Sequence, residues 1–105
     1  MVIYILNAAI IPSYGKYIFR RMEIEEAREL VKQGFVSAIG HEGTARVLSE
    51  MLGTEIPVNR IRVSMEPRDK AIVFRLLQRL PEGKVLSREE LEKVPFELGL
   101  LERIE

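Results

Sequence analysis

The chain has no cysteine and no tryptophan, and it carries a single histidine, His41, among 105 residues. Without cysteine it cannot form disulfide bonds or thiolate metal sites. With one histidine, a zinc or iron site would need ligands that are almost all carboxylates, which is unusual for these metals. We therefore expect a protein that works with no metal and no cofactor.

An excess of charge of one sign is also absent, because sixteen Lys and Arg residues balance sixteen Asp and Glu residues. Affinity for long nucleic acids comes mostly from basic side chains that neutralise phosphates. The balanced charge therefore argues against long nucleic acid as a partner, whereas a small and compact anion is compatible with it.

Long apolar runs are missing too. Residues 1–6 (MVIYIL) are apolar but too few to cross a bilayer, and they lack the basic start of a signal peptide. We expect a protein of the cytoplasm that has no membrane partner.

The residues that are present fit one domain, residues 1–105, because 47% of them are hydrophobic. Runs of β-branched or alternating apolar residues predict strands, and apolar residues at helical spacing predict helices. The expected strands are residues 2–6, 17–21, 35–39, 59–65 and 70–78, and the expected helices are residues 23–33, a helix from residues 40–42 to Gly53, and one that starts at Ser87. We expect residues 59–65 and 70–78 to pair as a hairpin, and the tail 96–105 to be either a last helical turn or an edge strand. This order predicts the α/β class, with a small mixed β-sheet and helices packed on it.

His41 lies where a short apolar run leads through Gly40 into the second expected helix. The first N–H groups of a helix have no partner inside it and carry partial positive charge, so a phosphate can bind there beside the imidazole. Asn7 follows the first strand, at the end where open α/β sheets bind their ligands. Alternatively, His41 is a surface residue in a tight connection and Asn7 only closes a turn.

Arginines and one glutamate extend the set of candidates. The alternation in residues 59–65 places Arg60 and Arg62 on one face of a strand, although arginines there often only pair with glutamates. Arg79 and Glu82 flank a proline at the mouth of a turn. Together with His41 they suit the cleavage of an RNA phosphodiester by its own 2′-hydroxyl. In that chemistry an arginine holds the phosphate and a histidine protonates the departing 5′-oxygen.

One histidine per chain means that a pair of histidines would need two chains. A symmetric dimer would bring two His41 side chains to one two-fold ligand site.

Five motifs, which span nearly the whole chain, resemble in order and spacing those of the small viral anti-CRISPR ring nucleases that disarm type III CRISPR defence. They are residues 6–8 (LNA), 37–44 (SAIGHEGT), 52–54 (LGT), 59–60 (NR) and 79–87 (RLPEGKVLS).

The resemblance implies a homodimeric, metal-independent enzyme that binds cyclic tetra-adenylate and cuts it into linear di-adenylate with 2′,3′-cyclic phosphate ends. By motif position, His41 would be the general acid, and Arg79 and Glu82 would act at the scissile phosphate. Arg60 would contact the ligand backbone, and Asn7 would lie in the ligand cavity.

Gly40, Gly43 and Thr44 complete the candidate ligand-binding residues at the start of the second helix. Similar proteins carry serine at the position of Gly43, so one hydroxyl contact is lost there, and a backbone N–H can replace it. If the protein is viral, we expect it in the cytoplasm of the host cell.

Two other functions stay open from the residues. One is a non-catalytic viral regulator, which either sequesters a cyclic nucleotide or grips nucleic acid through Arg60, Arg62, Arg68 and Arg79. The other is a purely structural partner protein with no nucleotide affinity.

Overall fold

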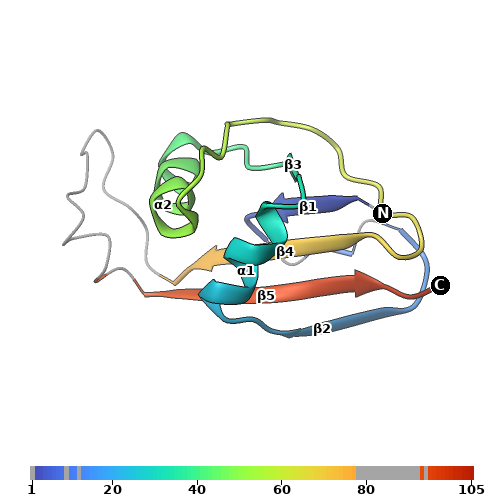
Figure 1. The fold of residues 1–105 in the computed structure, drawn as a ribbon. Helices are drawn as coiled ribbons and strands as arrows, with labels where there is room; N and C mark the ends of the chain where they lie inside the picture. Colours follow the sequence, from blue (N-terminus) through green and yellow to red (C-terminus); the bar gives the residue numbers. More distant parts are fainter. Residues whose placement is uncertain (1, 9, 12, 78–92, 94) are drawn as a thin grey trace.

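The computed structural model describes residues 2–8, 10–11, 13–77, 93 and 95–105, which form a five-stranded sheet and two helices (Figure 1). The strands are β1 (Ile3–Leu6), β2 (Tyr17–Arg21), β3 (Val36–Ser37), β4 (Lys70–Leu76) and β5 (Phe96–Arg103), and the helices are α1 (Ile24–Val31) and α2 (Glu42–Leu52). The prediction of a small α/β fold with a mixed sheet is confirmed.

The order of strands across the sheet is β2-β5-β4-β1-β3. Strand β1 runs parallel to both β3 and β4, whereas β5 runs antiparallel to β4 and β2. The carboxyl ends of β1, β3 and β4 therefore lie at the same end of the sheet.

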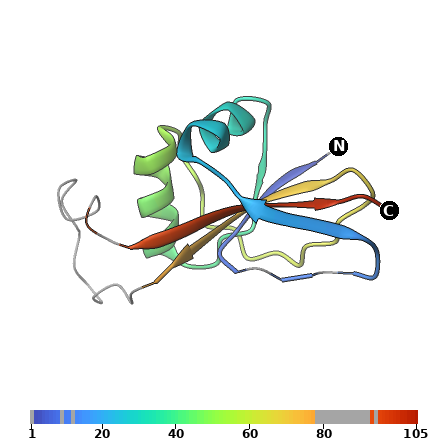
Figure 2. The ribbon, with the colours of Figure 1, turned by 90° about the horizontal axis from the view of Figure 1, so that it is seen from below.

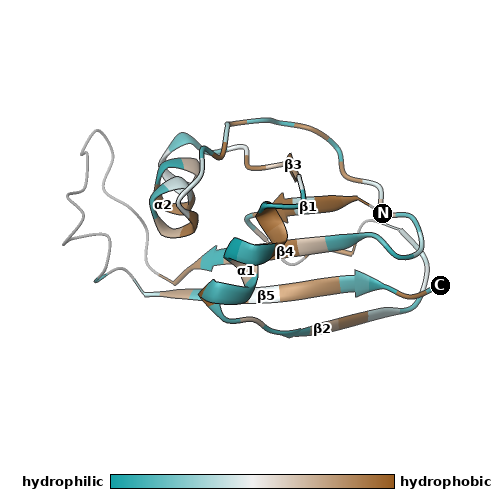
Figure 3. Ribbon diagram, in the orientation of Figure 1, coloured by the Kyte–Doolittle hydropathy of each residue, from teal (hydrophilic) through white to brown (hydrophobic). Residues whose placement is uncertain are grey.

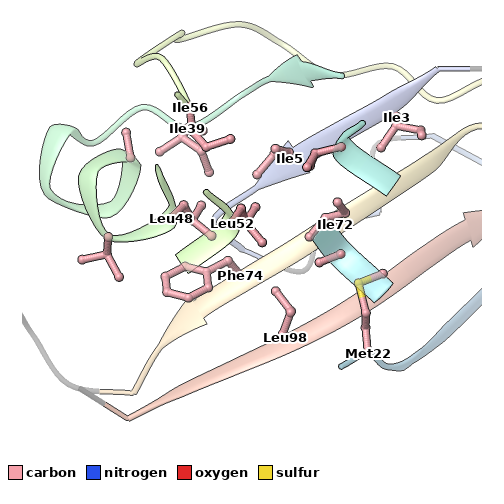
Figure 4. Close-up of a cluster of buried hydrophobic side chains, with 14 of the residues drawn as sticks. Ile3, Ile5, Met22, Ile39, Leu48, Leu52, Ile56, Ile72, Phe74 and Leu98 are labelled. Carbon is pink, nitrogen blue, oxygen red and sulfur yellow. The ribbon is translucent and has the colours of Figure 1, made fainter. Parts of the chain in front are cut away.

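Both helices cover one face of the sheet, as the view in Figure 2 shows. Alternate side chains of the inner strands point to this face, including Ile5 of β1, Phe74 of β4 and Leu100 of β5, each 0–1% exposed. They form one cluster with Leu48 and Leu52 of α2 (Figure 4). The hydropathy colouring in Figure 3 shows the same pattern, with apolar inner strands and largely polar outer surfaces on the helices.

The opposite face of the sheet is covered by chain without regular structure. The chain between α2 and β4 passes along the β3 side of the sheet (Figures 1 and 2). Its residues Val63 and Met65 then pack with Leu6, Val73 and Leu101 on the face away from the helices. The extended segment thus covers the second face in the place of a second layer of helices.

This arrangement shows that the prediction of a strand at residues 59–65 is wrong. The alternation of polar and apolar residues is real, because Val63 and Met65 face inward while Ile61, Arg62 and Ser64 are exposed. However, the segment lies on the face of the sheet and does not pair at a strand edge, so it forms no ladder. The prediction that Arg60 and Arg62 share one face of a strand is therefore also wrong.

The predicted hairpin is therefore wrong as well. Strand β4 pairs with β1 and β5, because four consecutive buried residues, 71–74, need neighbours on both edges and cover on both faces. The tail forms β5, which is an inner strand between β4 and β2 and not an edge strand. Its buried residues Leu98, Leu100 and Leu101 account for that position.

The two helices confirm the sequence patterns. Gly34 follows α1 with φ of 97°, and Gly53 ends α2 in the left-handed conformation with φ of 67°. Arg20 of β2 hydrogen-bonds Glu26 of α1, and this contact lowers the pKa of the Glu26 carboxyl. The helix expected from Ser87 lies outside the described residues.

The turn before β4 supplies a test of the fold. Asp69 is 3% exposed, and its carboxylate accepts hydrogen bonds from the N–H groups of Val2 at 2.9 Å and Glu66 at 2.8 Å. We expect Asp69→Ala to lower the free energy of unfolding in urea by about 1–3 kcal/mol, because both N–H groups lose their acceptor.

The matched control is Glu66→Ala, which removes a neighbouring exposed carboxylate and keeps the backbone bond. It should change stability by less than about 0.5 kcal/mol. Equal effects of the two substitutions would contradict the role assigned to Asp69.

Candidate functional site

Three segments that carry candidate residues start at the carboxyl end of the parallel strands. Asn7 follows β1, Gly40 and His41 come shortly after β3, and Leu77 follows β4. Asn7 and His41 are both exposed there. Open α/β sheets bind ligands at this end of their strands, so the position of Asn7 agrees with the sequence-based expectation.

His41 occupies the N-cap position of α2, as the sequence predicts. Its backbone is extended, with φ of −127° and ψ of 124°, and its carbonyl accepts the N–H of Ala45 at 3.0 Å. The imidazole makes no capping hydrogen bond. The side chain is thus placed in solvent next to the positive end of the helix dipole, where it can meet a bound anion.

Gly43 and Thr44 lie in the first turn of α2, where backbone N–H groups have no acceptor within the helix. Gly43 is half-buried and Thr44 is only 8% exposed. A ligand at this end can meet the backbone N–H groups of both residues, and Gly43 has no side chain to offer besides.

Arg60 is brought directly to this turn. Its Nε–H donates a hydrogen bond of 2.9 Å to the carbonyl of Gly40, the residue before His41. A Cβ atom on residue 40 would lie 3.2 Å from Cγ of Arg60, so glycine permits the close packing of the arginine on the backbone. Because Nε holds the carbonyl, the two terminal nitrogens of the exposed guanidinium can face an anion, and they pair with none of the residues that the structure describes.

Two further residues, to which the sequence patterns assign no role, hold the turn from behind. Asn59 donates from Nδ2 to the carbonyl of Ser37 at 2.8 Å and from its backbone N–H to the carbonyl of Ile39 at 2.8 Å. The hydroxyl of Ser37 donates to the carbonyl of Pro57 at 2.6 Å. The signals in the sequence are a serine inside an otherwise apolar run and the place of both residues in the motifs 37–44 and 59–60.

Arg79 and Glu82 lie outside the described residues. The described residues of this part of the chain extend to Leu77, which lies directly after β4 and two positions before Arg79. Their proposed roles therefore stay predictions from the sequence.

A hollow of about 390 Å³ lies elsewhere, between α1 and the carboxyl end of α2. Its charged lining residues are two acidic and two basic ones, Glu25, Glu29, Arg28 and Lys32. The carboxyl end of a helix carries partial negative charge. The basic side chains there are already engaged, Arg28 with the carbonyl of Met51 and Lys32 with Glu29, so this hollow offers a phosphodiester less positive charge than the start of α2 does. The chemistry therefore favours the opposite end of α2.

Neither metal binding nor a membrane span is supported by the residues that the structure describes. In the part of the chain that the structure describes, no group of three or more histidine, aspartate or glutamate side chains could hold a metal ion. None of the helices described is long and apolar enough to cross a membrane.

Comparison with known proteins identifies the family, since the model of the STIV B116-like family matches residues 3–98. The chain belongs to the STIV B116-like family. It is 43% identical to uncharacterized protein 26 of Sulfolobus islandicus filamentous virus, over 95% of this chain and 90% of that protein. It is 40% identical to uncharacterized protein ORF117 of Acidianus two-tailed virus, over 100% of this chain and 96% of that protein.

The fold is shared with a solved structure of this family. B116 of Sulfolobus turreted icosahedral virus superimposes with a TM-score of 0.84 at 25% identity, covering 98% of this chain and 100% of B116. The family is thus one with members in archaeal viruses, and its fold is the mixed sheet described above.

The geometry of the α2 start leads to a binding prediction. Inorganic phosphate, titrated into the isotopically labelled protein, should shift the NMR signals of the Gly43 and Thr44 backbone amides. Arg60→Ala should weaken this binding about three- to tenfold, because a charge-assisted hydrogen bond is lost at a partly exposed site.

The matched control is Arg62→Ala, which removes the same charge from an exposed residue two positions on and should leave the binding unchanged. Equal losses in both variants would indicate a diffuse charge effect and contradict a site at Arg60.

Proposed function

We propose that this protein is a metal-independent ring nuclease that cleaves cyclic tetra-adenylate into linear di-adenylate with 2′,3′-cyclic phosphate ends and so shuts off type III CRISPR signalling. The observation that carries the proposal is an exposed imidazole at the N-terminus of α2, with the guanidinium of Arg60 held beside the preceding peptide. The helix end and the arginine favour a phosphodiester, and the imidazole is a proton donor next to it.

The reaction needs only groups of the chain, the substrate and water. The ribose 2′-oxygen attacks the adjacent phosphorus and its proton passes to water. The bond from phosphorus to the 5′-oxygen breaks, and the protonated imidazole of His41 gives its proton to that oxygen. The products are a 2′,3′-cyclic phosphate and a 5′-hydroxyl, and two such cuts convert the ring into two di-adenylates.

The protein supplies position and charge in this scheme. The N–H groups of Gly43 and Thr44 and the guanidinium of Arg60 neutralise the phosphate. By the motif resemblance, Arg79 and Glu82 act at the scissile phosphate and Asn7 contacts the ligand.

A homodimer forms part of the proposal. The ring has repeated scissile linkages whereas each chain has one histidine. A two-fold arrangement gives each cut its own His41. The substrate is therefore a compact anion shared by two chains, which agrees with the balanced charge of sixteen basic and sixteen acidic residues.

The biological role is supported by the family. The chain is similar over nearly its full length to proteins of two archaeal viruses. A virus that meets type III CRISPR defence gains from an enzyme that destroys its second messenger, and this fits the resemblance to viral ring nucleases.

The activity is tested by incubating the purified protein with cyclic tetra-adenylate in the presence of EDTA and separating the products by chromatography. We expect complete conversion to di-adenylate with cyclic phosphate ends. A ring that stays intact at high enzyme concentration, but is bound, would instead support the sequestering regulator.

The role of His41 is tested with His41→Ala. Single-turnover cleavage should fall by roughly 10²–10⁴-fold, the usual contribution of a positioned acid, while ring binding is retained. The wild-type rate should also fall as the pH rises, since an acid must carry its proton. A rate that does not decline at high pH, or a variant as fast as the wild type, would exclude His41 as the acid.

A further inference from the structure

The turn that carries His41 is fastened to the chain that follows α2. Residues 57–60 run alongside residues 37–40, and four hydrogen bonds join the two segments. Asn59 donates to the carbonyls of Ser37 and Ile39, Arg60 donates to that of Gly40, and Ser37 donates to that of Pro57.

These bonds act on the orientation of the peptides before the N-cap. A peptide unit is planar, so the carbonyl of Gly40 and the N–H of His41 lie in one plane. The side-chain amide of Asn59 fixes the carbonyl of Ser37, and this places its backbone N–H on the carbonyl of Ile39. Arg60 fixes the carbonyl of Gly40. Together they set the direction in which the chain enters α2 and therefore the position of the His41 Cα and Cβ atoms.

Both segments are also anchored in the core. Ile39 is 0% exposed and Ile56 is 3% exposed, and both belong to the buried cluster under α2 (Figure 4). The hydroxyl of Ser37, in a residue 4% exposed, also accepts the N–H of Ile39 at 3.3 Å. The frame behind His41 is thus rigid, whereas the imidazole itself is exposed.

We propose that Asn59 and Ser37 are positioning residues that hold the Gly40–His41 peptide so that the imidazole meets the scissile linkage. This inference rests on the proposed ring nuclease function. Neither side chain touches the reacting atoms; both act through the backbone of the turn. A misplacement of about 1 Å can lower the rate of an enzyme about 100-fold, so the loss of these bonds should affect turnover more than binding.

The chain offers a matched control at the other end of the same segment. The hydroxyl of Ser49 donates to the carbonyl of Ala45 at 2.7 Å and accepts the N–H of Ile56 at 2.9 Å. Ser49→Ala therefore removes side chain to backbone bonds of the same kind as Asn59→Ala, but away from the turn. A merely structural role of Asn59 predicts equal behaviour of the two variants.

The experiment compares Asn59→Ala, Ser37→Ala and Ser49→Ala with the wild type, at a temperature where circular dichroism shows all four folded. We measure the single-turnover rate constant and the dissociation constant for cyclic tetra-adenylate, and the NMR signals of the amides of residues 40–44. Asn59→Ala and Ser37→Ala should lower the rate about 10- to 100-fold and change ring binding by less than about threefold. They should also shift the amide signals, whereas Ser49→Ala should keep the rate within about twofold and leave those signals in place.

Wild-type rates in both turn variants, or an equal loss in Ser49→Ala, would overturn the inference. Should Asn59→Ala fail to fold, Ser37→Ala alone decides between these outcomes. If the wild type does not cleave the ring, the proposed function fails, and the amide signals still decide whether Asn59 and Ser37 hold the turn. Signals of residues 40–44 that shift in the turn variants and not in Ser49→Ala support it, and unchanged signals refute it.

Discussion

The first N–H groups of α2 have no acceptor in the helix, and the parallel strand β3 delivers them to the end of the sheet where β1 and β4 also finish. This constraint sets what the site can bind. An anion is the ligand that satisfies such a helix end. The residue at the N-cap position of this helix is His41. Arg60 adds positive charge from a segment twenty residues away and packs on the glycine that precedes the histidine.

A second constraint, the cover of the other sheet face, explains the form of the chain after α2. The sheet needs cover on its second face, and residues 60–66 provide it as an extended segment through Val63 and Met65. To reach that face, the chain must pass the open side of β3, where Asn59 and Arg60 meet the turn. The segment that seals the second core therefore also holds the candidate site.

Local signals made much of this predictable. Glycines at 34 and 53, helical spacing and the apolar strand at the start gave α1, α2 and β1 close to their observed bounds. Long-range pairing was not predictable in the same way. Alternation in residues 59–65 reports an extended chain with one buried side, and it does not distinguish pairing at a strand edge from packing on a sheet face. β5 was ambiguous for the same reason, because its partners β2 and β4 are set by the topology and not by the sequence near it.

At the site, the position of His41 followed from a local turn, whereas the bonds of Asn59 and Ser37 join residues about twenty positions apart. Arg79 and Glu82 rest on motif position alone.

The most direct measurement is a crystal structure of the protein with a cyclic tetra-adenylate whose 2′-hydroxyls are replaced by hydrogen, so that the ring cannot be cut. We expect the ring on a two-fold axis between two chains, with a phosphate at the N–H groups of Gly43 and Thr44 and each His41 imidazole within hydrogen-bonding reach of a 5′-oxygen. A ring bound at the hollow between α1 and the carboxyl end of α2, or both imidazoles turned away from it, would contradict the claim that the start of α2 is where cleavage occurs.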